Sequence, residues 1–563
     1  MRLCEVIAKD LAKLGVQRGF GVPGEDIIEI IDAMPANGIV VTTARHENQS
    51  VAMADGYSRA TGEVAVAYVT GGPGFSNAIT ALNTAGRRGS GVILITGHGQ
   101  SGQKAIDSVA VCASVEVPCW RVSEGTTEEV AGALKSAFES ARRGRPAVFD
   151  LPSRILNNFV EAGTLLGERV GPENDTVVLP DPEEIEAIVE HLCSPDVRAP
   201  LILAGVGAIT PEAERSMLAI AEAIGALTST TLRANGLFGA DPFNLGIVGT
   251  YSTEVGSELL TPIDTVLVFG ASLNRFTTYG GELLRRAQVI QIDSDKAVEA
   301  APTTVRSRHF IYGDATATAE MFAERLAAAG NRFERLRTEG NRQRIAASDP
   351  ARSLPAFDQT AGYVDPRSFA AALDKVLPAE RAFVVDAGRH ATYTIPYISV
   401  PGANYFSQTN EAGSIGLALG GAIGQAVGHP GAVVVLGTGD AGLLMAVGDL
   451  DTVRRLELPM VILVANDEAL GAEVRFMELA GRQVTAALAD TPDLVAIARG
   501  FGIDAVRVTN KVEAEEVLNR IAVEGVRGPL MIELPIPANI AAPSIDFAFQ
   551  PLFHARRAEM PVK

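Results

Sequence analysis

Two acidic side chains follow two apolar segments in the last third of the chain. Asp440 lies in the glycine turn GTGDAG, residues 437–442, directly after the apolar run 433–436. Asp467 follows a second apolar run, 460–465, and an amphipathic segment joins the two runs. Strand, turn, helix and strand predict two parallel strands whose ends meet at one edge of a sheet. Carboxylate oxygens beside the backbone amides of a glycine turn suit a divalent cation that holds a diphosphate.

The turn alone could be a tight connection, with Asp467 as a helix cap. The paired arrangement, however, is similar to the diphosphate motif of thiamine-diphosphate enzymes, which begins Gly-Asp-Gly and ends Asn-Asn. The resemblance implies that Asp440, Asp467 and the carbonyl of Ala469 hold Mg²⁺. Ala441 replaces the usual glycine and Asp467 the commoner asparagine, which keeps an oxygen ligand but adds a negative charge. The resemblance assigns cofactor binding to Gly439, Asp440, Ala441, Gly442, Asp467, Ala469, Leu470 and Gly471.

Glu47 stands between a short apolar run at 39–43 and a predicted helix at 49–61. A glutamate at a helix start can serve the helix dipole alone. The surrounding sequence, RHENQSVAMADGYSRATG, closely resembles the glutamate motif of the same family, with Glu47 at the catalytic position. That role implies that its carboxyl group hydrogen-bonds the 1′ nitrogen of the cofactor's aminopyrimidine and so promotes loss of a proton from the thiazolium carbon. Such a carboxyl group needs a dry site that raises its pKa.

Two further segments of the first third could line the same site. The sequence GGPG at 71–74 resembles the loops that line the substrate side in acetolactate synthases and benzaldehyde lyase, which makes Gly72 a cofactor contact. His98 and Gln100 follow the next apolar run and could face the same cavity, His98 as a catalytic group. A turn histidine that faces solvent would explain His98 equally well.

Three catalytic candidates come from the last third. Residues 413–416, Gly-Ser-Ile-Gly, match a family motif in which an apolar side chain supports the bent cofactor. The resemblance gives this role to Ile415 and makes the Gly413 carbonyl an acceptor for the cofactor's 4′-amino group. His390 follows a predicted strand on a glycine-containing loop, where a proton-transfer group is useful. Glu473 stands where pyruvate and indolepyruvate decarboxylases have a functional glutamate. The alternatives are a core isoleucine, a histidine directed elsewhere and a solvated helix charge.

Apolar runs of strand length alternate with amphipathic segments, which predicts an α/β fold with doubly wound parallel sheets. Irregular stretches divide this pattern into three domains. By resemblance, residues 1–158 form a pyrimidine-binding domain, residues 185–345 a Rossmann-like middle domain and residues 365–545 a diphosphate-binding domain. The middle-domain sequences TLRANGLFG and GASLNRFTT stand where acetolactate synthases and pyruvate oxidases contact FAD. Other members keep this domain without a flavin, so FAD stays an open alternative.

Composition and charge exclude several classes of protein. The chain has 563 residues and a formal charge of −19, which disfavours nucleic acid and acidic membrane surfaces as partners. Cys4, Cys112, Cys119 and Cys193 lack CxxC or zinc spacing and indicate reduced thiols in a cytosolic protein. Residues 1–15 have the pattern of an amphipathic helix, and no uncharged run approaches the ~20 apolar residues of a membrane span. We therefore expect a cytoplasmic protein.

The resemblance covers nearly the whole chain, and in overall pattern it is closest to acetolactate synthases. It implies a homodimer or homotetramer with each site between two subunits, because Glu47 and Asp440 lie on separate domains. It also implies C–C cleavage in a 2-oxo acid or 2-hydroxy ketone, by decarboxylation, carboligation or both. Residues 109–111 and the helix after the metal motif depart from the acetolactate synthase pattern, so pyruvate is not assigned as the substrate. The alternatives are a 2-hydroxyacyl-CoA lyase, a flavin-linked 2-oxo acid oxidase and a cofactor-binding paralogue without turnover.

Overall fold

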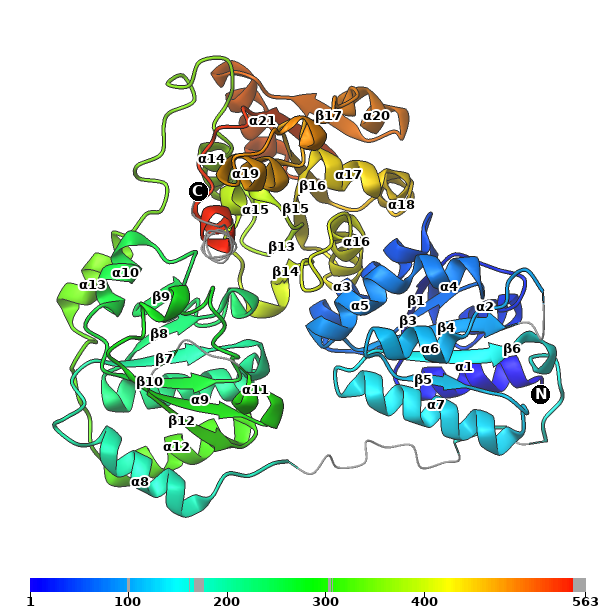
Figure 1. Cartoon of the computed structure of the whole chain (residues 1–563), viewed down its shortest axis with the longest axis horizontal. Helices are drawn as coiled ribbons and strands as arrows, with labels where there is room; N and C mark the ends of the chain where they lie inside the picture. The colour runs from blue at the N-terminus through cyan, green and yellow to red at the C-terminus, as the bar shows by residue number, and fades with distance from the viewer. Residues whose placement is uncertain (99–101, 162, 167–176, 302–304, 306, 550–563) are drawn as a thin grey trace, which may run out of the picture.

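Three six-stranded sheets form the framework of the computed structural model of the chain (Figure 1). The structure describes residues 1–98, 102–161, 163–166, 177–301, 305 and 307–549. Within these residues, all strand pairs of the three sheets are parallel. Helices alternate with the strands along the chain. The prediction of an α/β fold with three parallel sheets is therefore confirmed.

The first sheet has the strand order β2-β1-β3-β4-β6-β5. Its strands are β1 (Arg18–Gly21), β2 (Val40–Thr43), β3 (Ala65–Val69), β4 (Val92–His98), β5 (Cys119–Arg121) and β6 (Ala147–Pro152). The helices around it are α1 (Leu3–Lys13), α2 (Ile28–Ala36), α3 (Glu47–Thr61), α4 (Pro73–Asn77), α5 (Ile79–Arg88), α6 (Ser108–Ser114) and α7 (Thr127–Arg142). Helix α3 begins two residues earlier than the sequence suggested, because the His46 side chain caps it by accepting a hydrogen bond from the Asn48 amide.

The second sheet has the strand order β12-β11-β10-β7-β8-β9. Its strands are β7 (Pro200–Ala204), β8 (Leu227–Thr230), β9 (Asn244–Ile247), β10 (Thr265–Phe269), β11 (Gln288–Asp293) and β12 (Arg308–Tyr312). Its helices are α8 (Pro182–Leu192), α9 (Pro211–Ile224), α10 (Glu254–Leu260), α11 (Lys296–Ala300), α12 (Ala315–Ala329) and α13 (Glu339–Ala346). The strand order reverses between β10 and β7, which is the Rossmann-like feature of this domain.

The third sheet has the strand order β14-β13-β15-β16-β18-β17. Its strands are β13 (Arg381–Val385), β14 (Phe406–Gln408), β15 (Val433–Gly439), β16 (Met460–Asn466), β17 (Asp504–Arg507) and β18 (Leu530–Pro535). Its helices are α14 (Pro366–Val376), α15 (Arg389–Thr394), α16 (Ala418–Gly428), α17 (Asp440–Met445), α18 (Leu450–Arg455), α19 (Gly471–Leu479), α20 (Leu494–Gly500) and α21 (Lys511–Glu524). Strands β15 and β16 are central neighbours, and Gly439 pairs with Ala465, so both strands end at the same edge.

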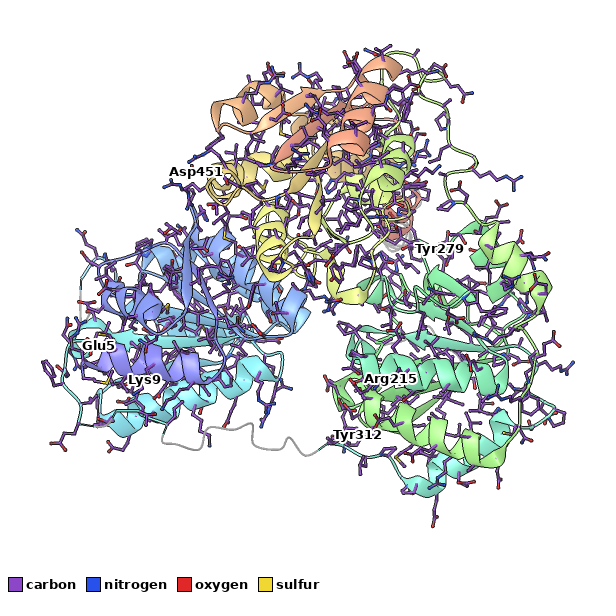
Figure 2. All side chains as sticks on the ribbon, turned by 180° about the vertical axis from the view of Figure 1, so that it is seen from behind. Glu5, Lys9, Arg215, Tyr279, Tyr312 and Asp451 are labelled. Atoms are coloured by element: carbon purple, nitrogen blue, oxygen red, sulfur yellow. The ribbon has the colours of Figure 1, made fainter. Side chains whose placement is uncertain are left out.

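The first and third domains meet through helices α3 and α16, which lie side by side in Figure 1. Glycines allow the two backbones to touch. A Cβ atom at Gly56 would lie 2.2 Å from the carbonyl oxygen of Gly421, and one at Gly424 would lie 2.1 Å from that of Met53. At the rim of this contact, Asp451 (labelled in Figure 2) accepts hydrogen bonds from the Arg45 guanidinium. The relative position of the two domains thus depends on a backbone-to-backbone helix contact.

Replacing Gly424 with alanine should lower the free energy of unfolding by about 1–3 kcal/mol, because the new methyl group overlaps backbone that cannot rotate away. Alanine favours a helix by up to about 1 kcal/mol over glycine. Helix propensity alone would therefore make the variant more stable, which is the opposite of the result expected from packing. Gly132→Ala in α7 is the matched control, since nothing lies within 4 Å of its Cβ position. Urea unfolding compares the two variants, and equal stabilities would contradict the packing argument.

Two arginines, buried Arg88 and partly exposed Arg233, join all three domains next to the loop that follows β14. Arg88 of α5 donates to the Gln408 carbonyl at 2.5 Å and to the Ser407 hydroxyl at 2.6 Å. Arg233 of the middle domain donates to the Arg88 carbonyl. The Glu411 carboxylate lies 3.6 Å from Arg88 Nη1 and 3.8 Å from Arg233 Nε. These contacts hold the segment that leads into residues 413–416.

Candidate active site

A cavity of about 360 Å³ opens at the C-terminal edge of the third sheet. It is bounded by the loops after β13, β14, β15 and β16 and by a segment that follows β18. Ligands of parallel α/β sheets bind beyond this edge of the strands. Its lining includes all of the site residues that the sequence assigned to the third domain: His390, Gly413, Ile415, Gly439, Asp440, Ala441, Gly442, Asp467, Ala469, Leu470, Gly471 and Glu473.

Asp440 and Asp467 occupy neighbouring strand ends in this cavity. The Thr491 hydroxyl donates to Asp440 Oδ2 at 2.7 Å, and burial raises the pKa of Asp440. Burial and then the nearby charge of Asp440 raise the pKa of Asp467 to about 6. A nearby cation stabilises two carboxylates whose charged forms are disfavoured by burial and by neighbouring acidic groups. The pair therefore fits a divalent metal ion.

The donor set also fits a metal that is shared with a diphosphate. Within the described residues there is no group of three or more His, Cys, Asp or Glu side chains that could hold a metal ion. A cation at Asp440 and Asp467 would therefore take further oxygens from the backbone and from the ligand. Mg²⁺ commonly binds through one or two carboxylates together with phosphate oxygens.

A strained turn places Ala469 after β16. Glu468 has a φ of 52°, in the left-handed region that non-glycine residues rarely occupy. The Asn466 side chain accepts from the Glu468 amide at 3.1 Å, and the Glu468 carbonyl accepts from the Ala489 amide at 2.8 Å. Ala469 and Leu470 follow directly and line the cavity. The surrounding hydrogen bonds hold this conformation, which is typical of functional turns.

Asp386, which the sequence reasoning did not select, anchors the loop with the Ile415 motif. Its Oδ2 accepts from the Gly416 amide at 2.8 Å, and burial raises its pKa to about 6. The Gly416 carbonyl accepts from the Gln49 side chain at 2.7 Å, which ties the same loop to α3. A Cβ atom at Gly442 would lie 2.5 Å from Asp386 Oδ2, so glycine is needed there. Ile415 is thus held at the cavity wall from two domains.

His390 lies in the short helix α15 rather than on a loop, and it is buried. This corrects the expectation from the sequence: the glycine, Gly388, precedes the helix as its N-terminal cap residue. The ring Nε2 lies 3.1 Å from the Asp386 carbonyl oxygen. A Cβ atom at Gly439 would lie 3.2 Å from Nδ1, so the ring packs against the glycine turn. Burial lowers the pKa of His390 to about 4, so the imidazole is neutral at pH 7.

The buried imidazole predicts a loss of stability in mild acid. The unfolded chain binds a proton at the ordinary pKa of 6.5, whereas the folded protein does so only near pH 4. Stability from this group is therefore complete above 6.5 and is lost as the pH falls toward 4, by about 3 kcal/mol in total. His390→Gln carries no such proton. The difference in urea midpoint between the native protein and this variant should shrink between about pH 7 and about pH 4.5. A difference that is independent of pH would contradict the prediction.

Arg389 is a second residue that the sequence reasoning missed. Its Nη1 lies 3.3 Å from Asp467 Oδ2, and its Nη2 donates to the Tyr393 hydroxyl at 2.9 Å and to the Ile540 carbonyl at 2.7 Å. A signal was present in the sequence, because an aspartate in place of asparagine adds a charge that a buried site must balance.

The segment after β18 closes one side of the cavity. Ile545, Ala548 and Phe549 line it, although the predicted diphosphate-binding domain ended at residue 545. Arg275 of the middle domain donates to the Ala548 and Phe547 carbonyls at 3.0 and 2.8 Å. Tyr279, labelled in Figure 2, stacks on Phe547 with ring centroids 4.5 Å apart. The middle domain therefore holds this segment in place.

The two segments that stand where some relatives contact FAD each carry an arginine that binds protein groups in this structure. Arg275 belongs to GASLNRFTT and bonds the segment after β18. Arg233 belongs to TLRANGLFG and bonds the Arg88 carbonyl. These contacts do not test flavin binding, and FAD stays an open alternative.

Glu47, Gly72 and His98 do not line this cavity within one chain. Glu47 Oε2 accepts from the Asn77 side chain at 3.0 Å at the C-terminal edge of the first sheet. A Cβ atom at Gly72 would lie 2.6 Å from the Lys104 carbonyl oxygen.

His98 also lies at that edge, where β4 ends. Its Nδ1 lies 2.7 Å from Asp150 Oδ1, which orients the ring. The other candidate at this strand end, Gln100, lies outside the described residues. The first domain thus presents its own group of candidate residues, separate from the cavity of the third domain.

Two further properties of the described chain bear on its class. No helix in it is both long and apolar enough to cross a membrane. Its four cysteines are free, with Cys4 and Cys112 buried.

Family models match all three domains in order. The thiamine pyrophosphate enzyme N-terminal TPP binding domain matches residues 1–114, the central domain residues 185–322, and the C-terminal TPP binding domain residues 386–534. TPP is thiamine diphosphate under its older name.

Curated relatives match over nearly the full length. A probable acetolactate synthase large subunit of Methanocaldococcus jannaschii is 27% identical over 97% of this chain and 93% of its own. The acetolactate synthase isozyme 3 large subunit of Escherichia coli is 27% identical over 94% and 93%. Sulfoacetaldehyde acetyltransferase of Rhodobacter capsulatus is 27% identical over 84% and 83%. The chain belongs to the thiamine pyrophosphate enzymes and is an acetolactate synthase-like, thiamine-diphosphate-dependent enzyme of the transferase or lyase type.

Proposed function

We propose that the protein uses thiamine diphosphate and Mg²⁺ to cleave the C–C bond beside the carbonyl of a 2-oxo acid or 2-hydroxy ketone, with or without ligation to a second carbonyl compound. The observation that carries the proposal is the cavity that brings together Asp440, Asp467, Gly413 and Ile415. A carboxylate pair for a metal and an apolar support beside a glycine turn are the parts that this cofactor requires.

The residues of the third domain would bind and orient the cofactor. Asp440, Asp467 and the Ala469 carbonyl would hold Mg²⁺, and the amides of residues 439–442 would bind the diphosphate. Ile415 would support the cofactor and the Gly413 carbonyl would accept from its amino group. When bound, thiamine diphosphate supplies a carbanion that adds to carbonyl groups and then stabilises the charge left by bond cleavage.

Side chains at the C-terminal edges of the first and third sheets would transfer protons. Glu47 would exchange a proton with the aminopyrimidine ring, as its motif implies. Neutral His390 can accept or donate a hydrogen bond beside the glycine turn, and Glu473 stands at the cavity wall on α19. His98, oriented by Asp150, can act as an acid or base from the first domain. These roles are proposals for each named residue.

We propose a homodimer as the smallest active form, with a homotetramer as the alternative. The supporting observation is that Glu47, Gly72 and His98 lie outside the cavity of their own chain, so a complete site would take them from a second copy. A symmetric dimer would then contain two equivalent sites. A cytoplasmic location, reduced thiols and a small-molecule substrate are consistent with this proposal.

Calorimetric titration of the purified protein with thiamine diphosphate and Mg²⁺ tests the cofactor part. Incubation of the loaded enzyme with a panel of 2-oxo acids, alone and with acceptor aldehydes or 2-oxo acids, tests the reaction, with products identified by mass spectrometry. An absorbance spectrum with visible flavin bands would favour the flavin-linked oxidase, and activity restricted to 2-hydroxyacyl-CoA would favour the lyase. Tight binding without turnover of any substrate would favour the paralogue without catalysis. Absence of cofactor binding would exclude the proposal as a whole.

A further inference from the structure

Arg389 is enclosed by the cavity wall and held on three sides. Its side chain is 5% exposed and that of its partner Asp467 is 9% exposed. Besides Asp467, the guanidinium bonds the Tyr393 hydroxyl and the Ile540 carbonyl, and the Tyr393 hydroxyl itself donates to that carbonyl at 3.1 Å. The position of the charge is therefore defined by the fold and not by Asp467 alone.

The backbone next to the pair is shaped to admit it. A Cβ atom at Gly471 would lie 2.2 Å from Asp467 Oδ2 and 2.8 Å from Arg389 Cδ. Any larger residue at the start of α19 would displace either the carboxylate or the guanidinium. The ion pair is thus built into the turn that carries Ala469 and Leu470.

The charges of the residues that line the cavity indicate the role of the Arg389–Asp467 ion pair. Asp440, Asp467 and Glu473 are acidic, His390 is neutral, and Arg389 supplies the positive charge among the described lining residues. A diphosphate that enters this cavity brings further negative charge, which a single divalent cation only partly offsets. A buried charge without a partner is costly.

We propose that Arg389 offsets the charge of Asp467. The offset lowers the affinity of the site for the cation and raises its affinity for the diphosphate. Arg389 acts through Asp467 and through the field in the cavity, so it is a positioning residue. The inference rests on the proposed function only in requiring that the cavity binds both ions.

The charge balance predicts opposite effects of two single substitutions. Arg389→Gln leaves Asp440 and Asp467 without the guanidinium, so a bare cation should bind more tightly and a metal-free diphosphate more weakly. Asp467→Asn leaves the guanidinium without its carboxylate, so both affinities should move the other way. Each single substitution should change an affinity by about tenfold, a free energy of about 1.4 kcal/mol. The double variant Arg389→Gln/Asp467→Asn should return both affinities to within about threefold of the native protein.

Two titrations of the full-length protein measure these affinities without any turnover. Mn²⁺ binding is followed by electron paramagnetic resonance in the absence of cofactor, and thiamine diphosphate binding is followed by calorimetry in the presence of EDTA. Arg389→Lys keeps the charge but loses the planar fork that bonds Tyr393 and Ile540, so both affinities should shift in the same directions as in Arg389→Gln but by a smaller factor. Arg337→Gln is the matched control, because it breaks a buried Arg–Asp pair of 2.7 Å in the middle domain and should change neither affinity.

Opposite shifts that the double variant cancels would support the inference. Losses of both affinities in either single variant, or no recovery in the double variant, would overturn it and leave a purely structural pair. If Arg389→Gln does not fold, Asp467→Asn still decides the sign, because the inference requires this variant to bind metal-free thiamine diphosphate more tightly than the native protein does. A native protein that binds neither Mn²⁺ nor thiamine diphosphate would instead refute the proposed function, and the inference with it.

Discussion

Asp440→Asn should weaken binding of thiamine diphosphate with Mg²⁺ by about 100-fold or more, while the protein without cofactor becomes no less stable. Loss of a single outer partner of a metal ligand already costs about 10–100-fold in affinity, and this substitution removes the charge of the ligand itself. Stability should not fall, because burial raises the pKa of Asp440 and so penalises its charged form in the folded protein.

Calorimetry of the loaded complex and thermal unfolding of the free protein separate the two effects. Thr491→Val is the matched control, because it removes the hydroxyl that donates to Asp440 Oδ2 but keeps the carboxylate. We expect it to cost about tenfold in affinity. If Asp440→Asn lowered the melting temperature and affinity together, Asp440 would be a structural residue and not a metal ligand.

Glu47→Gln should reduce the turnover number by about 100-fold to 10,000-fold, the range of general acid–base catalysis, and leave cofactor affinity nearly unchanged. Glutamine keeps the size and one hydrogen bond of the side chain but cannot exchange the proton. Glu5→Gln is a suitable control, because Glu5 (labelled in Figure 2) is also an acidic residue in the first turn of a helix and lies elsewhere, on α1. Unaltered turnover of Glu47→Gln would remove Glu47 from the mechanism.

Mixing the two inactive variants tests whether the site is shared between subunits. In a mixed dimer, one site would combine Glu47 and Asp440 from the unaltered halves of the two chains, and the other site would carry both substitutions. Random exchange should therefore restore about a quarter of the native activity. A site within one chain would give no recovery, because every chain in the mixture carries one lesion.

Periodicity in the sequence was sufficient to place Asp440 and Asp467 together. Both follow strands of a parallel sheet, and parallel neighbours end at the same edge whatever their side chains do. Gly413, Ile415 and Glu473 were selected by resemblance to family motifs, and they too line the cavity. Periodicity could not reveal which cation balances Asp467, since Arg389 lies 78 residues away in sequence.

Helix geometry explains why neighbouring residues in α15 have different partners. Successive residues of a helix point about 100° apart, so Arg389 reaches Asp467 while His390 packs beside Asp386 and the glycine turn. The sequence predicted a strand followed by a loop at this position. A loop does not determine the directions in which the Arg389 and His390 side chains point. The burial that lowers the pKa of His390 depends on packing from several elements and is not encoded in its local sequence.

By itself, the sequence determined the three parallel sheets, the residues at the strand ends and the resemblance of the paired motifs, because these depend on local periodicity and spacing. Only the tertiary structure decided that Arg389 pairs with Asp467, that Asp386 anchors the Ile415 loop, and that the segment after β18 closes the cavity. It also placed Glu47 outside the cavity of its own chain. Such pairings depend on side-chain directions and domain contacts between residues far apart in sequence, which no local pattern contains.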